Sequence, residues 1–355
     1  MNIQKQKSNS LTILELNYEK SWRGGERQTL YNMQGFRHAQ QSVELLCRRS
    51  FPLEAEAKKQ GFKTHGFNSI FSVLFFLIIK GKNYDVIHAQ TSHILTYCIL
   101  TKPFHKATIV FSKRVDFVPK GFFTKLKYKL TDNVTVISSA IKTIFNAFGI
   151  PQVSVISDIA VKTTLHKTRA ERILAEYNIP SDKKRIGTLA AFVPHKDPLN
   201  MVEAIYLVSK QRNDFVFLHF GEGPLMQEVQ QKIKDYNLSE VYKIMGFHQQ
   251  AEDFFSVLDG FVMSSEEEGL GSSVLDAFLY EVPVASTNAG GLKDLLKDQR
   301  GEVCDIHSPI ELAKCIDAVL THNERTELLI QNAKKYVTQY HSMEYITNQY
   351  LALLK

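Results

Sequence analysis

Short apolar runs alternate with amphipathic segments from one end of the chain to the other. This alternation is typical of parallel α/β sheets, in which helices connect successive strands. At 355 residues the chain is long for one domain and comfortable for two, so we expect two such sheets. The apolar runs predict strands at residues 11–16, 42–47, 84–89, 107–111, 134–138, 153–156, 185–189, 215–220, 242–245, 260–263 and 282–285.

Two stretches interrupt this pattern. Residues 157–172, SDIAVKTTLHKTRAER, are polar and are interpreted as the connection between the domains. Residues 70–79, IFSVLFFLII, form the longest apolar run, which at ten residues is too short to cross a bilayer. We expect a buried or membrane-facing helix there. Two further helices are predicted at the C-terminal end, at residues 326–340 and 342–354.

The composition narrows the functional class. Hydrophobic residues make up 44% and charged residues 23%, which excludes a largely disordered chain. A net charge of +6 fits an anionic ligand or an anionic membrane surface, and nucleic acid is not expected as a partner. Four scattered cysteines, without a CxxC pair, and a polar N-terminus, MNIQKQKSNS, indicate a cytoplasmic protein without a zinc site.

The segment from residue 264 to residue 291, SSEEEGLGSSVLDAFLYEVPVASTNAGG, combines an acidic cluster, a glycine turn, a short helix and a second Gly-Gly turn. The spacing of Glu268 and Asp276 predicts that both carboxylates lie on one face of one helix. Carboxylates suit the hydroxyls of a sugar and a ribose, because each oxygen accepts from a neighbouring hydroxyl. The alternative is an acidic cluster that stabilises the helix dipole. The loop expected to offer N–H groups to phosphate comprises Gly269, Leu270, Gly271, Ser272 and Ser273.

Two other loops follow predicted strands and open helices. Gly24 and Gly25 would let the backbone approach a phosphate at a helix N-terminus, although a Gly-Gly pair is often only a turn. The loop GTLAAFVPHKDP carries Lys196, which could hold a diphosphate as a point charge or simply be a solvated lysine.

Glycines recur at two more strand ends. Gly221 and Gly223 lie in FGEGP, and Met245, Gly246 and Phe247 form a similar junction in which the aromatic ring could receive a nucleobase. Each glycine alone indicates a turn, whereas their repetition along one sheet edge favours a ligand site.

Taken in order, these motifs resemble the retaining family 4 glycosyltransferases of the GT-B fold. The resemblance spans nearly the whole chain and is most specific over residues 187–301; the motifs are Gly-Gly-Glu-Arg, YDVIHAQ, GTLAAFVPHKDP, FGEGPL, IMGF, SSEEEGLGSSVLDAF and NAGGLKDLL. It implies two facing Rossmann-like domains: an acceptor-binding domain at residues 1–165 and a nucleotide-sugar-binding domain at residues 166–339. It also implies that a final helix at about 340–355 packs back on the first domain, and that no metal or other cofactor is needed.

The resemblance assigns roles to individual residues. Glu268 is expected to contact the donor sugar and Lys196 the diphosphate, which makes them the catalytic candidates. Gly24 and Gly25 match the N-terminal diphosphate loop, residues 245–247 the base-binding strand end, and Asp276 the ribose contact.

Three positions depart from the family pattern. Asp276 replaces a glutamate, Ala191 stands where an arginine often partners the lysine, and Ser112 stands where many members carry a histidine. Lys113 and Arg114 are the candidates to supply the missing positive charge. Because of these departures, a catalytically silent nucleotide-sugar-binding subunit remains an alternative to a glycosyltransferase. A nonhydrolysing nucleotide-sugar epimerase is a second alternative.

The acceptor side is interpreted from charge. Residues 102–130 carry seven lysines and Arg114 against the single acid Asp116, interleaved with phenylalanines. Such a basic aromatic stretch could dock on an anionic membrane; a solvated charged face is the alternative. We therefore expect an envelope glycolipid, lipopolysaccharide or polysaccharide as the acceptor and a peripheral location on the inner face of the cytoplasmic membrane. His88 and His93 are either acceptor-side bases or structural residues.

Overall fold

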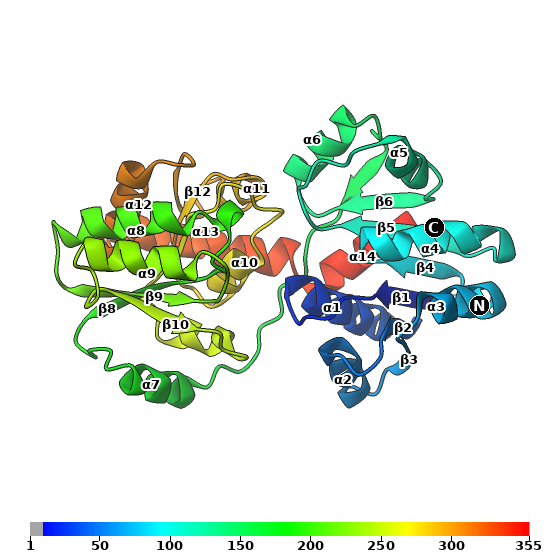
Figure 1. Ribbon diagram of the computed structural model, residues 1–355, viewed down its shortest axis with the longest axis horizontal. Helices are drawn as coiled ribbons and strands as arrows, with labels where there is room; N and C mark the ends of the chain where they lie inside the picture. Colours follow the sequence, from blue (N-terminus) through cyan, green and yellow to red (C-terminus); the bar gives the residue numbers. More distant parts are fainter. Residues whose placement is uncertain (1–9, 355) are drawn as a thin grey trace, which may run out of the picture. The chain divides into compact units, whose positions relative to one another are not determined.

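The chain divides into two compact units, shown in Figure 1. The computed structural model describes residues 10–354, so nine residues of the polar N-terminal segment lie outside the described residues. The N-terminal unit runs up to Ile159 and takes in the chain again from Met343, whereas Ala160–Ser342 form the C-terminal unit.

A parallel sheet forms the centre of the N-terminal unit. Its strands are β1 (Thr12–Asn17), β2 (Ser42–Arg48), β3 (Lys63–Phe67), β4 (Val86–Ala89), β5 (Thr108–Lys113), β6 (Asn133–Val136) and β7 (Val153–Val155). Its helices are α1 (Gly24–His38), α2 (Pro52–Lys59), α3 (Ile70–Lys80), α4 (Ser92–Thr101), α5 (Phe122–Lys129), α6 (Ser139–Ala147) and α14 (Met343–Leu353), with the 3₁₀ turns η1 (Gly81–Asn83) and η2 (Lys102–Phe104). The described strands are ordered β3-β2-β1-β4-β5-β6-β7.

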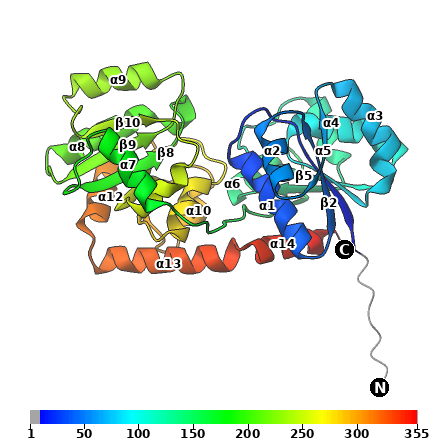
Figure 2. The same cartoon turned by 90° about the horizontal axis from the view of Figure 1, so that it is seen from below.

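The strand order places the helices of this unit in two layers. The chain moves outward from β1 to β3 in one direction and from β4 to β7 in the other, so right-handed crossovers place the connecting helices on opposite faces. Helix α1 packs against α2 and α14, whereas α4 packs against α3 and α5, as Figures 1 and 2 show. The carboxyl ends of β1 and β4 therefore mark the switch point, where parallel sheets bind ligands.

The last helix is built into this unit. A Cβ atom at Gly35 of α1 would lie 2.1 Å from Thr347 Oγ1 of α14, so only glycine allows this approach of the two helices. On the same helix, the buried Tyr350 hydroxyl lies 2.9 Å from Ser112 Oγ of β5. The last helix thus packs into the core of the N-terminal unit, where Tyr350 also contacts the Phe36 ring.

The C-terminal unit repeats the architecture. Its strands are β8 (Lys184–Leu189), β9 (Phe215–Phe220), β10 (Tyr242–Gly246), β11 (Gly260–Met263), β12 (Val284–Thr287) and β13 (Glu302–Cys304), in the parallel order β10-β9-β8-β11-β12-β13. Its helices are α7 (Lys167–Glu176), α8 (Pro198–Ser209), α9 (Met226–Asp235), α10 (Ser272–Leu279), α11 (Leu292–Leu296), α12 (Pro309–Thr321) and α13 (Glu324–Tyr340), with the 3₁₀ turns η3 (Pro194–Lys196) and η4 (Ala251–Ser256). Helix α8 packs between α9 and α12, and α10 packs against α13.

The predicted α/β class with two parallel Rossmann-like sheets is confirmed. Two strands escaped prediction, β3 and β13, because both are edge strands that lack a continuous apolar run. Strand β12 begins two residues later than expected, at Val284, because the chain first turns through Glu281, whose φ is +63°.

Two other predicted stretches differ from expectation. Helix α7 occupies part of the polar stretch that was interpreted as a connection, where Arg169 pairs with Asp253 of η4. Helix α3 coincides with the apolar run, yet only Val73 and Leu77 are buried in it. Among the described helices, none combines the length and the apolar character that a membrane span requires. The four cysteines are all buried thiols, without a disulfide.

Candidate active site

Lys196 and Glu268 meet at the carboxyl edge of the C-terminal sheet. Lys196 ends the turn η3 that follows β8, and its Nζ forms an ion pair with Glu268 Oε2 in the loop that follows β11. Ser265 Oγ donates to the same carboxylate oxygen at 3.5 Å. The two side chains are only 19% and 14% exposed, so the pair lies in a partly desolvated site where charge interactions are strengthened.

Backbone contacts hold the two loops together. The backbone amides of Glu266 and Glu267 both donate to His195 O, at 3.1 and 3.2 Å. Ser264 Oγ donates to Lys196 O at 2.9 Å, and Thr287 Oγ1 at the end of β12 donates to Ser265 O at 2.6 Å. The loops after three neighbouring strands therefore form one rigid rim that positions the Lys196–Glu268 pair.

The two carboxylates of the opening motif do not share a helix. Helix α10 begins only at Ser272, because Gly271 has φ +99° and caps the helix in a left-handed conformation. Glu268 consequently lies in the loop, and only Asp276 lies on the helix, where it is 8% exposed. The prediction of one shared helical face is wrong.

Two glycines outside the predicted site support this loop. A Cβ atom at Gly290 would lie 2.1 Å from Glu268 O, and one at Gly291 would lie 2.3 Å from Gly269 O. The Gly291 amide also donates to Glu268 O at 2.7 Å. The second Gly-Gly turn therefore fixes the backbone on which Glu268 sits, and the NAGG motif was its signal in the sequence.

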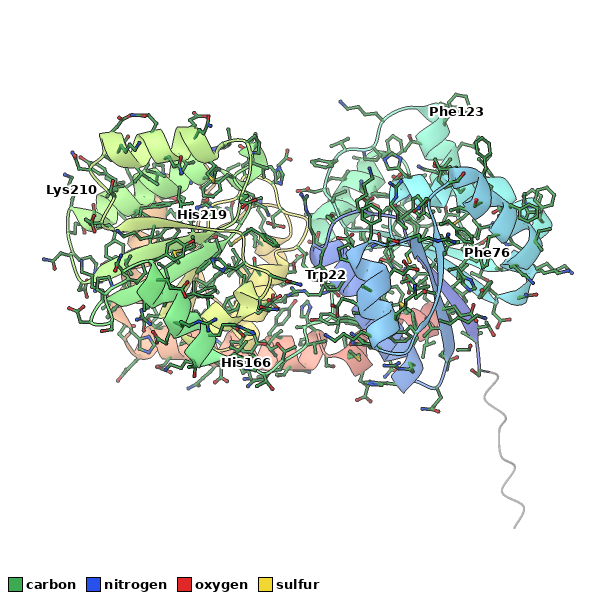
Figure 3. All side chains as sticks on the ribbon, turned by 60° about the horizontal axis from the view of Figure 1, so that its bottom comes forward. Trp22, Phe76, Phe123, His166, Lys210 and His219 are labelled. Atoms are coloured by element: carbon green, nitrogen blue, oxygen red, sulfur yellow. The ribbon has the colours of Figure 1, made fainter. Side chains whose placement is uncertain are left out.

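Gly221 and Gly223 have a packing role. Cβ atoms at these positions would lie 2.1 Å from Ala190 O and 2.4 Å from Phe192 O. Ala190 O also accepts a hydrogen bond from Nε2 of His219, labelled in Figure 3, at 3.0 Å. Burial lowers the pKa of His219 to about 4, so its ring is neutral near pH 7. The loop leading to Lys196 thus rests on this glycine turn, which favours the turn alternative.

The end of β10, residues 245–247, has a buried part and an exposed part. Met245 is 1% exposed, and its carbonyl accepts from Tyr177 Oη at 3.1 Å. Gly246 has φ +72° with open space around the position of a Cβ atom, and Phe247 beside it is 65% exposed. Phe247 is therefore the residue of this group whose ring is available to a ligand.

In the N-terminal unit, Gly24 and Gly25 open α1 as expected. No atom lies within 4 Å of the position of a Cβ atom at Gly25, so packing within the protein does not demand glycine there. Glu26 Oε2 accepts from the Arg23 amide at 2.8 Å, and burial raises the pKa of Glu26 against the effect of this bond. The open helix N-terminus leaves room for the backbone to approach an anion.

His88 and Ser112 belong to a buried hydrogen-bonded chain. His88 Nδ1 lies 2.8 Å from Glu15 Oε1, and His88 Nε2 lies 2.8 Å from Ser112 Oγ. Ser112 Oγ also lies 2.8 Å from Thr135 Oγ1 and 2.9 Å from the Tyr350 hydroxyl. Because His88 is 1% exposed and both of its ring nitrogens are engaged, the structural alternative is favoured for it over that of an acceptor-side base.

Arg114 and Lys113 follow Ser112 but differ in their partners. Arg114 pairs with Asp158 and donates from Nε to Gln90 Oε1 at 3.2 Å. Lys113 is 8% exposed, and burial lowers its pKa. Arg114 is therefore committed to a buried ion pair, whereas Lys113 is not.

One group of side chains among the described residues has the spacing of metal ligands. His307 Nδ1 lies 3.0 Å from Asp197 Oδ2, and His307 Nε2 lies 3.4 Å from Glu266 Oε2. An imidazole ordinarily offers one nitrogen to a metal, whereas here both nitrogens face carboxylates. The geometry fits a hydrogen-bonded bridge between the two loops, and we assign no metal to it.

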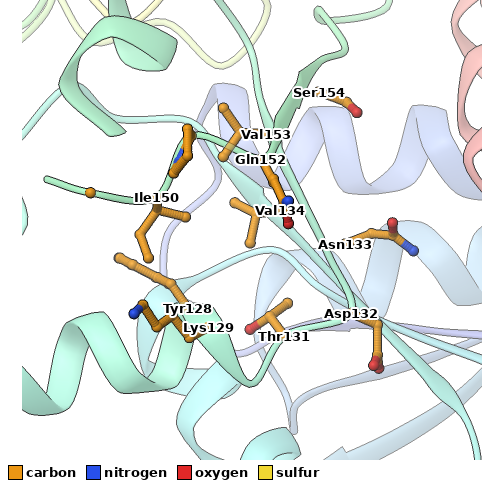
Figure 4. Close-up of a pocket in the computed structure, with 12 residues that line it drawn as sticks. Tyr128, Lys129, Thr131, Asp132, Asn133, Val134, Ile150, Gln152, Val153 and Ser154 are labelled. Carbon is orange, nitrogen blue, oxygen red and sulfur yellow. The ribbon is translucent and has the colours of Figure 1, made fainter. Parts of the chain in front are cut away.

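A polar pocket of about 640 Å³ lies elsewhere in the N-terminal unit (Figure 4). It is lined by residues that precede β6 and β7, including Thr131, Asp132 and Gln152, and so lies at the amino-terminal edge of the sheet. Both oxygens of Asp132 are engaged, by Lys102 Nζ and by the Ile109 amide. This pocket contains none of the predicted site residues.

Comparison with known proteins identifies the C-terminal unit. A family model described as glycosyl transferases group 1 matches residues 169–336. This match covers most of the C-terminal unit, Ala160–Ser342. The matched segment contains the Lys196–Glu268 pair and every glycine loop of the C-terminal unit described above.

Relatives and solved structures extend the likeness to glycosyltransferases. The lipopolysaccharide core biosynthesis glycosyltransferase LpsE of Rhizobium meliloti is 28% identical over 182 residues, which cover 51% of this chain and 52% of that protein. This chain spans about a third to a half of the length of LpsE and of two other curated relatives.

Two solved structures share the fold over almost the whole chain. Anabaena Alr3699/HepE in complex with UDP has a TM-score of 0.84 at 17% identity, covering 97% of this chain and 99% of its own. A glycosyltransferase from Rickettsia africae has a TM-score of 0.84 at 19% identity, covering 98% of each chain. These likenesses establish the GT-B fold class.

Proposed function

We propose that this chain transfers a sugar from a nucleotide-sugar donor to an envelope glycolipid, lipopolysaccharide or polysaccharide acceptor, with retention and without a metal. The observation that carries the proposal is the Lys196–Glu268 ion pair, held by the loops after β8, β11 and β12 at the carboxyl edge of the C-terminal sheet. LpsE is a lipopolysaccharide core biosynthesis enzyme, and the HepE structures contain UDP or UDP-glucose. The name of LpsE supports a lipopolysaccharide acceptor, and the HepE structures support a nucleotide-sugar as the donor.

The ion pair suggests how donor binding would proceed. A diphosphate that reaches Lys196 Nζ offers the ammonium group a new counter-charge, which frees Glu268 to accept from hydroxyls of the donor sugar. As the bond between sugar and diphosphate breaks, negative charge grows on the leaving group, and Lys196 stabilises it in a partly desolvated site. Lys196 thereby supplies a fixed positive charge in the position where a metal would otherwise be needed.

The test is release of nucleotide diphosphate. The full chain is incubated with a panel of nucleotide-sugars, with and without membrane extract, and the nucleotide products are separated by chromatography. We expect release that depends on the extract for at least one donor. Conversion of the donor to an isomer without release would indicate an epimerase, and donor binding without either product would indicate a silent subunit.

Substitution of Ala191 by arginine tests whether the absence of an arginine at this position limits turnover. Ala191 is exposed, and its Cα lies in the loop that rests on Gly221, so a longer side chain has room. We expect Ala191→Arg to accelerate nucleotide diphosphate release by about tenfold or more, because a second charge-assisted contact to the diphosphate contributes roughly 1.5–3 kcal/mol. Ala191→Gln, which has no charge, is the matched control. Binding without turnover in both the parent and the Ala191→Arg protein would contradict transfer and support the silent subunit.

The acceptor side of the proposal rests on an exposed aromatic surface. We name it the α3–α5 surface; it comprises the exposed side chains of Ile70, Phe71, Phe75, Ile79, Leu100, Phe104, Phe122, Phe123 and Leu126. Helix α4 packs against both α3 and α5, so the helices that carry most of these side chains form one layer of the N-terminal unit (Figure 1). Phe71 is 81% exposed, and Phe123, labelled in Figure 3, is 82% exposed.

Exposed lysines lie on or next to the segments that carry these rings. Lys80, Lys120 and Lys129 are exposed on the same segments, and a pocket of about 590 Å³ lined by Phe67, Phe71, Phe75 and Phe76 opens along α3. Apolar side chains with a positive rim fit the interface of an anionic bilayer, since the rings enter the headgroup region and the lysines attract the lipids. We propose that this surface docks the protein on the membrane that carries its acceptor.

Vesicle flotation tests the docking surface. The protein is expected to float with phosphatidylcholine vesicles that contain phosphatidylglycerol and to dissociate as salt is added. The double variant Phe71→Ser, Phe75→Ser should weaken binding by about tenfold or more per ring, because each buried phenyl contributes roughly 1.5–3 kcal/mol. Ile310→Ser on α12 of the C-terminal unit, which removes a 62% exposed residue, is the control. Unchanged flotation of the double variant would contradict docking through α3.

A further inference from the structure

Lys113 carries a positive charge that the protein leaves without a close partner. It ends β5 at the carboxyl edge of the N-terminal sheet and is 8% exposed. Its ammonium group makes no hydrogen bond or ion pair with any residue that the structure describes. A lysine so nearly buried is ordinarily paired, because removing an ammonium group from water is costly. Burial lowers the pKa of Lys113, and the charge of Asp116 opposes that change only in part.

A second lysine lies close to the first. Lys127 of α5 donates from Nζ to Ser92 O at 2.9 Å, to Ser92 Oγ at 2.8 Å and to Thr96 Oγ1 at 3.3 Å, all of which are uncharged. Burial lowers the pKa of Lys127, and the positive charge of Lys113 lowers it further. The positive charge of Lys113 therefore acts on Lys127, and neither ammonium group is hydrogen-bonded to a carboxylate among the described residues.

The first turn of α4 adds donors at the same place. Ala89 and Phe111 are partners in the β4–β5 ladder, so the residues that follow them, up to Thr91 and Lys113, lie side by side beyond the strand ends. Thr91 precedes α4, and its buried Oγ1 has no hydrogen-bond partner. The free backbone N–H groups of a ten-residue helix contribute further partial positive charge.

We propose that Lys113, Lys127 and the first turn of α4 bind an acidic group, a phosphate or a carboxylate, of the sugar acceptor. This inference rests on the proposed function, in which the N-terminal unit receives the acceptor. The bound anion relieves the repulsion between the two lysines and gives the Thr91 hydroxyl an acceptor. The exposed lysines beside the α3–α5 surface are the ones proposed to attract lipid. Lys113 at the end of β5 and Lys127 on α5 are less exposed and are proposed to serve the substrate.

Lysine acetylation read by mass spectrometry tests the site directly. Full-length protein that carries Lys196→Met, so that anions do not bind at the donor site, is acetylated with and without orthophosphate or malonate at constant ionic strength. We expect one of these anions to slow acetylation of Lys113 and Lys127 several-fold while exposed Lys210 is unaffected. Protection by orthophosphate identifies a phosphate group and protection by malonate a carboxylate. Absence of protection by both, or equal protection of Lys210, would overturn the proposal.

The pH dependence of anion protection and a variant of Lys113 distinguish an anion-binding site from a purely structural role of these lysines. Anion protection should fall as pH rises through the lowered pKa of Lys113, because the neutral amine no longer attracts the anion. Lys113→Gln, checked for folding by the fluorescence of Trp22, should remove the protection of Lys127 by the anion; retained protection would overturn the proposal. In a transfer assay the same variant should raise the KM for the acceptor more than it lowers kcat. Protection without transfer would refute the proposed function and leave the anion site intact, whereas transfer without protection would refute the site alone.

Discussion

Replacing Lys196 by methionine is expected to slow nucleotide diphosphate release by about 100- to 1000-fold, the effect of removing one preorganised donor to a developing anion. Methionine keeps much of the side-chain length but removes the charge that pairs with Glu268. Donor binding should weaken less than turnover, since the negative charge on the leaving group grows in the transition state. Single-turnover kinetics with the best donor, together with equilibrium dialysis, would separate the two effects.

A matched lysine elsewhere serves as the control for this variant. Lys210 lies at the end of α8 in the same unit, exposed, with its ammonium group 4.6 Å from the centre of the Tyr206 ring. Lys210→Met should leave turnover unchanged, and Glu268→Gln should reduce it through the sugar contact. If Lys196→Met retained full activity with a normal thermal transition, the ion pair would be structural and the proposed chemistry would be wrong.

Replacing Asp158 by alanine is expected to lower the free energy of unfolding of the N-terminal unit by about 3–5 kcal/mol, because it leaves the Arg114 guanidinium buried without its counter-charge. The side chains of Arg114 and Asp158 are only 11% and 7% exposed. Arg114 would keep the hydrogen bond to Gln90, which cannot neutralise it. Asp158 is also among the last residues of this unit before the chain enters the other one, so loosening should start there.

Tryptophan fluorescence during urea unfolding measures the loss of stability in the N-terminal unit, where Asp158 lies. Trp22 is the single tryptophan of the chain and packs against the N-terminal core around Leu30 and Met33 (Figure 3). Lys63→Ala is the control, because Lys63 is 67% exposed and its partner Glu44 keeps bonds to His65 and Tyr84. That control should change stability by less than about 1 kcal/mol. Equal transitions for the wild-type and Asp158→Ala proteins would show that the buried pair contributes nothing.

Apolar periodicity predicted most of the sheet framework, and its failures have physical causes. The interior strands β4 and β9 are apolar except for one histidine each, because helices cover both faces of the sheets, and this signal is readable in the sequence. Edge strands β3 and β13 need no such run and were missed. The exposure of α3 was equally hidden, since an apolar helix looks the same in sequence whether it faces a core or a bilayer.

The candidate site shows where sequence reasoning stops. Lys196, Glu268 and the glycine loops were found from their places after strands, but the direct pairing of Lys196 with Glu268 depends on tertiary structure. The shared helical face failed because a left-handed Gly271 delays the start of α10. The packing roles of Gly221 and Gly290 were also invisible, because a glycine needed for a close backbone approach is identical in sequence to one needed for a ligand.

Because the chain returns to the N-terminal unit at Met343, the two units cannot complete their folding in the order in which they are synthesised. A ribosome delivers the first unit's sheet early, but the helix that covers α1 and reaches Ser112 emerges only after the whole C-terminal unit. The C-terminal unit, by contrast, is one continuous segment and can complete its core before that helix emerges. A nascent or prematurely terminated chain therefore exposes the apolar side of α1 around Gly35 and Phe36, and such chains are the ones that chaperones and proteases would recognise.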